Sequence, residues 1–214
     1  MKLYAVTLSP YAARVRLALR LKGISFDLVP PPGGGTRTPE YLAISPIGKI
    51  PVLVTDDGLT IAESETIIDY LDEAFPEPSL MPSDPSVRVQ IRNAVRMVEL
   101  YVVPSLSRLF AQMDPASRNT HIVEAEMASL RNGLVLAQHF VDNAGFVAGG
   151  AISKADCVVL PTLLLCGVAG QIYGVSDIVS EFSELSGYRA KARKHDDMGA
   201  IWNETEEALR AIVR

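Results

Sequence analysis

A serine followed by a proline occupies a predicted strand-to-helix turn near the start of the chain. Ser9 and Pro10 follow the β-type segment KLYAV (2–6) and precede a segment of helical periodicity that begins at Tyr11. At such a turn, exposed backbone N–H groups and the positive end of the helix dipole converge, so a thiolate or another anion is stabilised there. A simpler interpretation makes Ser9 only the N-cap of the helix, with Pro10 at its first position.

Two further positions combine reactive or polar groups with an element boundary. Ile50-Pro51 stands at the start of the apolar segment PVLV (51–54), where a cis peptide would turn the N–H and C=O of Ile50 outward. The alternative is a trans edge-strand proline, the commoner form. Glu63-Ser64 opens a helix, with Ser64 suited to be its N-cap at a terminus that can hold a carboxylate. Taken alone, that feature is also ordinary capping.

The elements that must position these residues form a small α/β unit. The segments KLYAV (2–6) and SFDLV (25–29) bracket a helical segment at 11–22, which predicts a β-α-β order. Asp57-Gly58 lies between two apolar runs and predicts a hairpin, and an amphipathic helix follows up to Phe75. The whole order, β-α-β-β-β-α, predicts a mixed sheet covered by helices.

Beyond the Pro-rich segment PEPSLMPSDP (76–85), the pattern changes to long helical periods. A stripe of apolar residues predicts a long helix from Ile91 to Leu109 that is kinked at Pro104. Further helices are predicted at 122–141, 154–171, about 178–195 and about 200–213. We therefore predict domains at 1–78 and 86–214, joined by a linker at 79–85.

Composition excludes several classes of protein. The chain has 214 residues with 20 Lys and Arg against 25 Asp and Glu, and its formal charge of -5 opposes a surface that tracks nucleic acid. Cys157 and Cys166 form no C-x-x-C pattern and are predicted to be buried thiols in a reducing compartment. The first residues lack the features of a secretory signal, so the expected location is the cytoplasm.

One stretch raises the question of a membrane, and the histidines raise that of a metal. Residues 157–176 carry no charge and are long enough to cross a bilayer, but Pro161 and several glycines favour a buried core helix. His121, His139 and His195 show no metal-ligand spacing. We predict neither a membrane partner nor a metal site.

Three features of the first 65 residues are specific in combination. Ser9 at a strand-to-helix turn, Lys-Ile-Pro (49–51) before a strand and Glu-Ser (63–64) before a helix closely resemble the glutathione-binding domain of the cytosolic glutathione transferases, a thioredoxin-like fold. The segment S-P-Y…R-V-R (9–16) is similar to the bacterial serine-type, zeta and theta-like branches of that family.

The resemblance extends over the whole chain. FVAGGAISKADCVVLP (146–161) is similar to the family's signature of Gly, Ser-x-x-Asp and a buried helix, in which Ser153 and Asp156 form a capping box. The implied fold class is α/β plus all-α: an N-terminal thioredoxin-like β-α-β-β-β-α domain and a C-terminal all-helical domain. The loop PPPGGG (30–35) departs from the commoner family pattern.

The resemblance implies a catalytic role for Ser9. Its hydroxyl hydrogen-bonds the sulfur of glutathione and favours the thiolate, so Ser9 is an activator and not a covalent nucleophile. Tyr4 is a rival activator, because other branches use a tyrosine near the end of this strand, but a mid-strand tyrosine is usually a core or sheet-face residue.

The same resemblance implies the glutathione-binding residues. Ile50 offers its backbone to the cysteinyl unit beside a cis Pro51, and Lys49 meets the glycyl carboxylate. Ser64 and the helix that it opens hold the γ-glutamyl carboxylate, while Glu63 takes the γ-glutamyl ammonium.

The electrophile pocket is expected between Ser9–Tyr11 and the first long helix of the second domain. One face of that helix carries Tyr101, Ser105 and Arg108 at helical spacing. A tyrosine and an arginine facing a thiolate could orient or polarise an electrophile. Alternatively, Tyr101 and Arg108 make only solvated or interdomain contacts.

The predicted function is that of a glutathione S-transferase: activation of the glutathione thiolate for attack on an apolar electrophile, a detoxifying conjugation. Glutathione is the co-substrate, and the resemblance implies a homodimer. Two alternatives stay open. One is a glutathione-dependent isomerase or ether-cleaving enzyme, which needs the same thiolate. The other is a non-catalytic protein that binds glutathione or apolar ligands on the same fold.

Overall fold

The computed structural model describes residues 1–142 and 145–213, and its internal contacts divide the chain into two units. Unit 1 comprises Met1–Leu80 and Asp196–Arg214, and unit 2 comprises Met81–His195. The change of unit near residue 80 falls within the predicted linker. The contacts group the last helix with the α/β part, whereas the sequence pattern groups it with the helices before it.

Unit 1 is built on a mixed sheet with the strand order β2-β1-β3-β4. The strands are β1 (Lys2–Tyr4), β2 (Asp27–Val29), β3 (Val52–Val54) and β4 (Thr60–Ala62). β1 runs parallel to β2 and antiparallel to β3, and β3 runs antiparallel to β4. The register aligns Leu3, Leu53 and Ile61, and all three are buried. The predicted hairpin is present, with the φ of +89° at Gly58 that an Asp-Gly turn requires.

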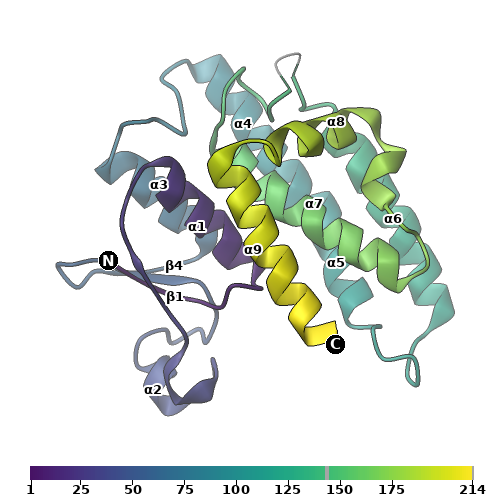
Figure 1. Cartoon of the computed structure of the whole chain (residues 1–214), viewed down its shortest axis with the longest axis horizontal. Helices are drawn as coiled ribbons and strands as arrows, with labels where there is room; N and C mark the ends of the chain where they lie inside the picture. Colours follow the sequence, from purple (N-terminus) through teal and green to yellow (C-terminus); the bar gives the residue numbers. More distant parts are fainter. Residues whose placement is uncertain (143–144, 214) are drawn as a thin grey trace. The chain divides into compact units, whose positions relative to one another are not determined.

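The helices of unit 1 cover this sheet. They are α1 (Pro10–Leu21), α2 (Pro39–Leu42), α3 (Ser64–Ala74) and α9 (Asp196–Val213), with a 3-10 turn η1 (Pro32–Gly34). α1 and α3 pack together on one face of the sheet and α2 lies on the other (Figure 1). α9 packs against α1, which explains its place in unit 1. The predicted fold class, a thioredoxin-like sheet followed by an all-helical part, is confirmed.

Two local details of unit 1 differ from the sequence prediction. A short helix, α2, follows the Pro/Gly-rich loop; Thr38 caps it by accepting the N–H of Tyr41 at 3.3 Å, and Pro39 begins it. Four residues are too few to carry a helical period, so the pattern missed it. The prediction that Ser64 is an N-cap is wrong by one residue, because Glu63 holds that position and Ser64 is the first helical residue.

Unit 2 is helical throughout its named elements. These are α4 (Pro85–Met97), a π-helical segment η2 (Val98–Val102), α5 (Val103–Phe110), α6 (Thr120–Gln138), α7 (Lys154–Ile172), a 3-10 turn η3 (Ile178–Glu181) and α8 (Ser183–Ala192). α7 is the central helix and packs against α4, α5 and α8 (Figure 1).

A π-helical segment interrupts the long predicted helix just before Pro104, where the sequence predicted a kink. α4, η2 and α5 are continuous in sequence, and Pro104 stands in the first turn of α5, directly after η2. Proline donates no backbone hydrogen bond, so the helical ladder is interrupted just before it. α6 crosses η2 very closely at Gly133. A Cβ added at this glycine would lie 2.3 Å from the carbonyl oxygen of Tyr101, so the close approach requires glycine.

The predicted capping box begins α7. The hydroxyl oxygen of Ser153 accepts the N–H of Ala155 at 3.1 Å, and the Asp156 carboxylate accepts the N–H of Ser153 at 2.8 Å. The carboxylate also accepts the N–H of Val147 at 3.2 Å. Burial raises the pKa of Asp156 to about 7, although these N–H groups act in the opposite direction.

Among the described residues, α7 is the helix long and apolar enough to cross a membrane, with a mean hydropathy of 1.7. Inside unit 2, however, 72% of its apolar stretch is buried. α7 is therefore a core helix, as its all-round apolar character predicts.

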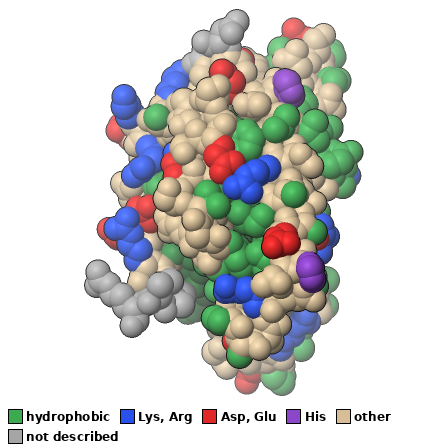
Figure 2. Space-filling view, turned by 90° about the vertical axis from the view of Figure 1, so that its right-hand side faces the viewer, with side chains coloured by type: hydrophobic (Ala, Val, Ile, Leu, Met, Phe, Trp, Pro, Cys, Tyr) green, Lys and Arg blue, Asp and Glu red, His purple; other side chains and the backbone are tan. Residues whose placement is uncertain are grey.

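Charged side chains of both signs are intermixed on the face shown in Figure 2, with hydrophobic side chains gathered between them. This distribution fits the small formal net charge of the chain and gives that face no basic stripe of the kind that tracks phosphates.

Candidate functional site

The register of the sheet in unit 1 brings three predicted site segments to one edge. Tyr4, at the end of β1, pairs with Val52, at the start of β3, and Val52 pairs with Ala62, at the end of β4. Neighbouring strands lie about 4.8 Å apart. The turn that carries Ser9, the residues before β3 and the residues after β4 therefore leave the sheet side by side.

Ser9 is the N-cap of α1, and its hydroxyl is only partly used. The oxygen accepts the N–H of Ala12 at 3.3 Å, and Pro10 follows at the first helical position. In the part of the chain that the structure describes, the Ser9 hydroxyl has no acceptor for its own proton. The first turn of α1 carries no acidic side chain. A buried hydroxyl beside a helix N-terminus is thus free to donate to an anion.

Lys49, Ile50 and Pro51 lead into β3. The Ile50-Pro51 peptide is cis, as the cis alternative proposed. Neither the N–H nor the C=O of Ile50 has a hydrogen-bond partner among the described residues. The exposed ammonium of Lys49 likewise makes no ion pair within the described ranges. These backbone and side-chain groups are available to a ligand with carbonyl, amide and carboxylate groups.

Glu63 and Ser64 form the third segment. Glu63 is exposed and adopts φ +67° and ψ 120°, a conformation that residues with a side chain rarely adopt, and it makes no capping hydrogen bond to α3. Ser64 is buried in the first turn, and its hydroxyl has no partner among the described residues. Strain of this kind, on the order of 1–3 kcal/mol, gathers at functional sites. The N-terminus of α3 is thus left open for an anion.

A buried tyrosine that sequence reasoning missed supports this edge. Tyr41, in α2, donates from its hydroxyl to the carbonyl oxygen of Lys49 at 2.6 Å. Its ring also packs against that of Tyr4, with centroids 6.2 Å apart. Tyr4 is the last residue of β1 and not mid-strand, as the longer predicted strand implied, but its ring does have a packing partner. The Thr38-Pro39 cap could have indicated α2, but the contact of Tyr41 with Lys49 joins residues eight positions apart across a loop, which no periodicity reports.

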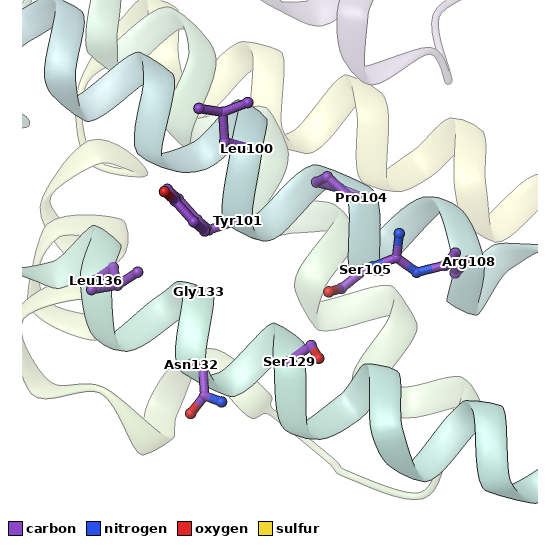
Figure 3. A pocket seen from close by; sticks show the side chains of 9 residues that line it. All are labelled: Leu100, Tyr101, Pro104, Ser105, Arg108, Ser129, Asn132, Gly133 and Leu136. Atoms are coloured by element: carbon purple, nitrogen blue, oxygen red, sulfur yellow. The ribbon is translucent and has the colours of Figure 1, made fainter.

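Of the residues predicted for an electrophile pocket, three lie together in unit 2. Tyr101, Ser105 and Arg108 line a cavity of about 270 Å³ between η2, α5 and α6 (Figure 3). Ser105 is buried, whereas Tyr101 is 47% exposed. Arg108 forms an ion pair with Glu126 of α6, which raises the pKa of Arg108. The remaining walls come from Leu100, Pro104, Ser129, Asn132, Gly133 and Leu136.

Tyr11 belongs to unit 1 and stands in the first turn of α1. The guanidinium carbon of Arg14 lies 4.6 Å from the centre of the Tyr11 ring, a cation–π contact. Its predicted part in an electrophile pocket stays a prediction. In the residues described, no group of three or more His, Cys, Asp or Glu side chains could hold a metal ion.

Comparison with known proteins finds glutathione S-transferases and a maleylacetoacetate isomerase among the relatives of this chain. Residues 3–79 match the family model described as glutathione S-transferase, N-terminal domain. The chain is 31% identical over 184 residues to maleylacetoacetate isomerase of Pseudomonas aeruginosa, covering 82% of this chain and 84% of that protein. It is 27% identical over 214 residues to a glutathione S-transferase of Pseudomonas putida, covering 100% of this chain and 96% of that one.

A solved structure gives the same fold. The crystal structure of a glutathione S-transferase from Methylobacillus flagellatus, with GSH bound, matches with a TM-score of 0.79 over 94% of this chain and 98% of that one. The identity is 23%, so this likeness concerns the fold.

Proposed function

The chain belongs to the cytosolic glutathione transferase superfamily, and on that premise we propose that it binds glutathione at the strand-end edge of unit 1 and activates its thiol for attack on an apolar electrophile. The observation that carries the proposal is the register Tyr4–Val52–Ala62. This register brings three groups to one edge of the sheet: the hydroxyl of Ser9, the backbone N–H and C=O of Ile50, and the N-terminus of α3. Among the described residues, none of these groups has its hydrogen bonds fully used.

In this proposal Ser9 activates the thiol. Its free proton is donated to the glutathione sulfur, and the N-terminus of α1 adds positive potential. Both effects favour the charged thiolate over the thiol and so lower the thiol pKa toward neutral pH. Ser9 forms no covalent bond with the substrate.

The other residues hold the tripeptide. The N–H and C=O of Ile50 pair with the cysteinyl backbone beside cis Pro51, and the ammonium of Lys49 meets the glycyl carboxylate. Ser64 and the N-terminus of α3 hold the γ-glutamyl carboxylate, and Glu63 takes its ammonium. The open hydrogen-bonding groups of these residues support the assignment.

The proposed reaction is conjugation. The thiolate attacks an electrophilic carbon, a sulfur–carbon bond forms, and a leaving group departs with its electron pair or a proton is taken up on the neighbouring atom. That Tyr101, Ser105 and Arg108, which line a cavity within unit 2, contact the electrophile stays a prediction. Arg108 is engaged by Glu126, so its role there is to orient rather than to supply an unpaired charge.

A second candidate is a glutathione-dependent isomerase of the serine-type, zeta-like branch. The relative with 31% identity over 84% of its length is named maleylacetoacetate isomerase, which supports this candidate. The thiolate would add to a carbon of the double bond, rotation would follow, and expulsion of the thiolate would restore the double bond. Isomerisation returns glutathione, whereas conjugation consumes it.

The test of the proposed function is a titration of glutathione into the wild type and Ser9→Ala. The ultraviolet absorbance of the bound thiolate is followed against pH. We expect a lowered thiol pKa in the wild type that Ser9→Ala loses. Absence of binding, or an unshifted thiol in both proteins, would contradict catalysis and favour the non-catalytic binding protein.

A substrate assay separates the two reactions. The protein is incubated with glutathione and either a chloronitrobenzene or maleylacetoacetate, and residual glutathione is measured beside product. Equimolar loss of glutathione identifies conjugation. Isomerised product with glutathione unchanged identifies the isomerase. Retained glutathione binding without turnover of either compound or of several further electrophile classes would favour the non-catalytic binding protein.

The family also supports a homodimer in the cytoplasm. We propose both from the resemblance, and sedimentation equilibrium of the purified protein tests the first directly. A single species at the mass of one 23.2 kDa chain would contradict the dimer.

A further inference from the structure

We propose that Glu204, in the last helix, is a positioning residue for Ser9: through Arg16 it holds the turn from which Ser9 acts. The functional part of this inference rests on the proposed function. Among the described residues, the ion-pair partners of Glu204 are Arg16 and Arg20, and neither belongs to the predicted glutathione site. Its effect passes through one guanidinium group to the backbone of the turn between β1 and α1.

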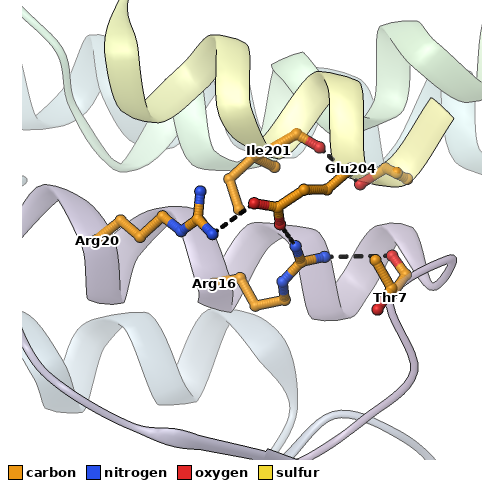
Figure 4. Close-up of polar contacts among 6 residues, drawn as sticks. Thr7, Arg16, Arg20, Ile201 and Glu204 are labelled. Atoms are coloured by element: carbon orange, nitrogen blue, oxygen red, sulfur yellow. Dashed lines mark hydrogen bonds and ion pairs between the residues drawn. The ribbon is translucent and has the colours of Figure 1, made fainter. Parts of the chain in front are cut away.

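Arg16 makes the link between α9 and the turn (Figure 4). Its side chain, on α1, is only 3% exposed and forms an ion pair with Glu204, 188 residues away in sequence. The other end of its guanidinium donates to the carbonyl oxygen of Thr7 at 3.2 Å. One planar group therefore contacts both α9 and the segment that precedes Ser9.

The Thr7 carbonyl lies inside the turn that ends at Ser9. The N–H of Ser9 donates to the carbonyl oxygen of Val6 at 3.1 Å, which closes a four-residue turn with Thr7 at its second position. This turn lies between β1 and α1 and belongs to neither. A hydrogen bond to Thr7 therefore limits rotation of the peptide groups that set the direction of the Ser9 side chain.

The carboxylate of Glu204 is what keeps the Arg16 guanidinium in place. Burial, together with the neighbouring Arg20, lowers the pKa of Arg16 to about 10, so Arg16 is charged at neutral pH. A buried charge without a counter-charge is strongly unfavourable. Glu204 also accepts from Arg20 at 2.6 Å and so lies between the two cations. If its charge is removed, Arg16 and Arg20 repel each other, and Arg16 is driven toward solvent and away from Thr7.

The position of Glu204 is fixed by the packing of α9. Met198, Ile201 and Trp202 are buried, and the hydroxyl of Thr205 donates to the carbonyl oxygen of Ile201 at 2.8 Å. Glu204 is thus presented from a helix anchored within unit 1. The carboxylate has a defined place from which to hold Arg16.

Another buried ion pair in unit 1 supplies the contrast. Lys22, at the end of α1, pairs with Asp72 at 2.7 Å and donates to the carbonyl oxygens of Phe75 and Pro78. These contacts join the end of α1 to the end of α3 and to the segment after it. Loss of that pair affects stability without reaching the Ser9 turn, so it is a matched control.

The first measurement needs no glutathione. We expect Glu204→Gln to speed hydrogen exchange of the Ser9 and Ala12 amides roughly tenfold, because the turn and the cap that protect them loosen. Asp72→Asn controls for loss of a buried pair, and Glu206→Gln controls for loss of a charge on α9, where the ion-pair partner of Glu206 among the described residues is the exposed Arg210. Neither control should change the exchange rates of these two amides relative to the other amides of unit 1. Unchanged exchange in Glu204→Gln would overturn the inference.

The second measurement is the pKa of the bound glutathione thiol in the same variants. We expect Glu204→Gln to lose at least half of the wild-type shift and to lower kcat more than it raises KM, with both controls unchanged. If the pKa of glutathione bound to the wild type is not lowered, the proposed function fails. The hydrogen-exchange rates of the Ser9 and Ala12 amides still decide whether Glu204 holds the Ser9 turn. If the wild-type shift persists in full in Glu204→Gln, the positioning role is overturned.

A second variant covers the case in which Glu204→Gln does not fold. Glu204→Asp keeps the charge but shortens the side chain by one methylene, so the ion pair weakens without leaving Arg16 and Arg20 uncompensated. We expect intermediate values of both the exchange rates and the thiol shift. Wild-type values of both in Glu204→Asp, with Glu204→Gln unfolded, would overturn the inference in favour of a purely structural ion pair.

Discussion

Two helices of this chain begin at a buried serine cap, and the two serines use their hydrogen bonds differently. Ser153, at the start of α7, accepts the N–H of Ala155 and donates to the carbonyl oxygen of Val147 at 3.2 Å, and Asp156 completes the capping box. Ser9, at the start of α1, accepts the N–H of Ala12 and, among the described residues, donates to none. The cap of α7 is complete, and that of α1 is not.

Under the proposed function, this difference separates a structural cap, at Ser153, from one that also serves binding, at Ser9. A helix N-terminus offers positive potential wherever it occurs, so residue type and position do not distinguish the two serines. The hydroxyl proton distinguishes the two serines, because Ser153 donates its proton to a carbonyl oxygen and Ser9, among the described residues, donates to none. At α7 a carbonyl oxygen and an acidic side chain of the protein satisfy the groups around the cap. At α1 the first turn carries no acidic side chain, which leaves the cap suited to an anion from outside the chain.

The largest expected effect comes from Ser9→Ala. Removal of a donor aimed at a developing or stabilised anion lowers kcat by about 10²–10³-fold. Loss of the cap lowers the free energy of unfolding by only about 1 kcal/mol. Steady-state kinetics and urea denaturation measure the two effects. Ser9→Thr, which keeps a hydroxyl, is the control. A loss of stability without loss of activity would make Ser9 a cap like Ser153.

The converse change is Asp156→Ala, which should act on stability alone. It leaves the buried N–H groups of Ser153 and Val147 without an acceptor, and we expect the free energy of unfolding to fall by about 3 kcal/mol. The matched control is Asp84→Ala, which removes the exposed cap of α4 and should lower it by about 1 kcal/mol. Equal losses measured in urea would show that the buried cap is no more important than an exposed one.

The buried carboxylate also predicts a pH dependence. Because the folded pKa of Asp156 is raised to about 7, the folded state binds its proton more tightly than the unfolded state. The resulting stability is complete below the ordinary pKa of 3.8 and is lost as pH rises through about 7. Urea denaturation of wild type and Asp156→Asn should therefore show the advantage of the wild type shrinking between pH 5 and pH 8. A constant difference would contradict the raised pKa.

The smallest expected effect concerns a third helix start, that of α3, which has no side-chain cap. Glu63→Gly relieves the positive φ and should raise the free energy of unfolding by about 1 kcal/mol while weakening glutathione binding, seen as a higher KM. Glu63→Gln keeps the strain and removes the charge, so KM should rise with unchanged stability. If Glu63→Gly lowered stability, the strain argument would be wrong.

Much of the local structure followed from the sequence, because local chemistry decides it. The Asp57-Gly58 turn, the cap at Ser9 and the capping box of Ser153 and Asp156 depend on residues only a few positions apart, and all three are present in the structure. The apolar run of α7 predicted a core helix for the same reason. The short helix α2 and the exact start of α3 were missed, because one helical turn carries too little pattern.

The candidate site, too, has features that local sequence decides and features that depend on long-range contacts. The sequence by itself determined which residues could bind an anion and at which helix or strand boundary each of them stands. Only the tertiary structure decided that Tyr4, Val52 and Ala62 share one register, and that Arg16 meets a carboxylate 188 residues away. Local propensities act over a few residues, whereas strand pairing and burial select partners across the whole chain. The packing of α9 against α1 is what gives the buried guanidinium its counter-charge.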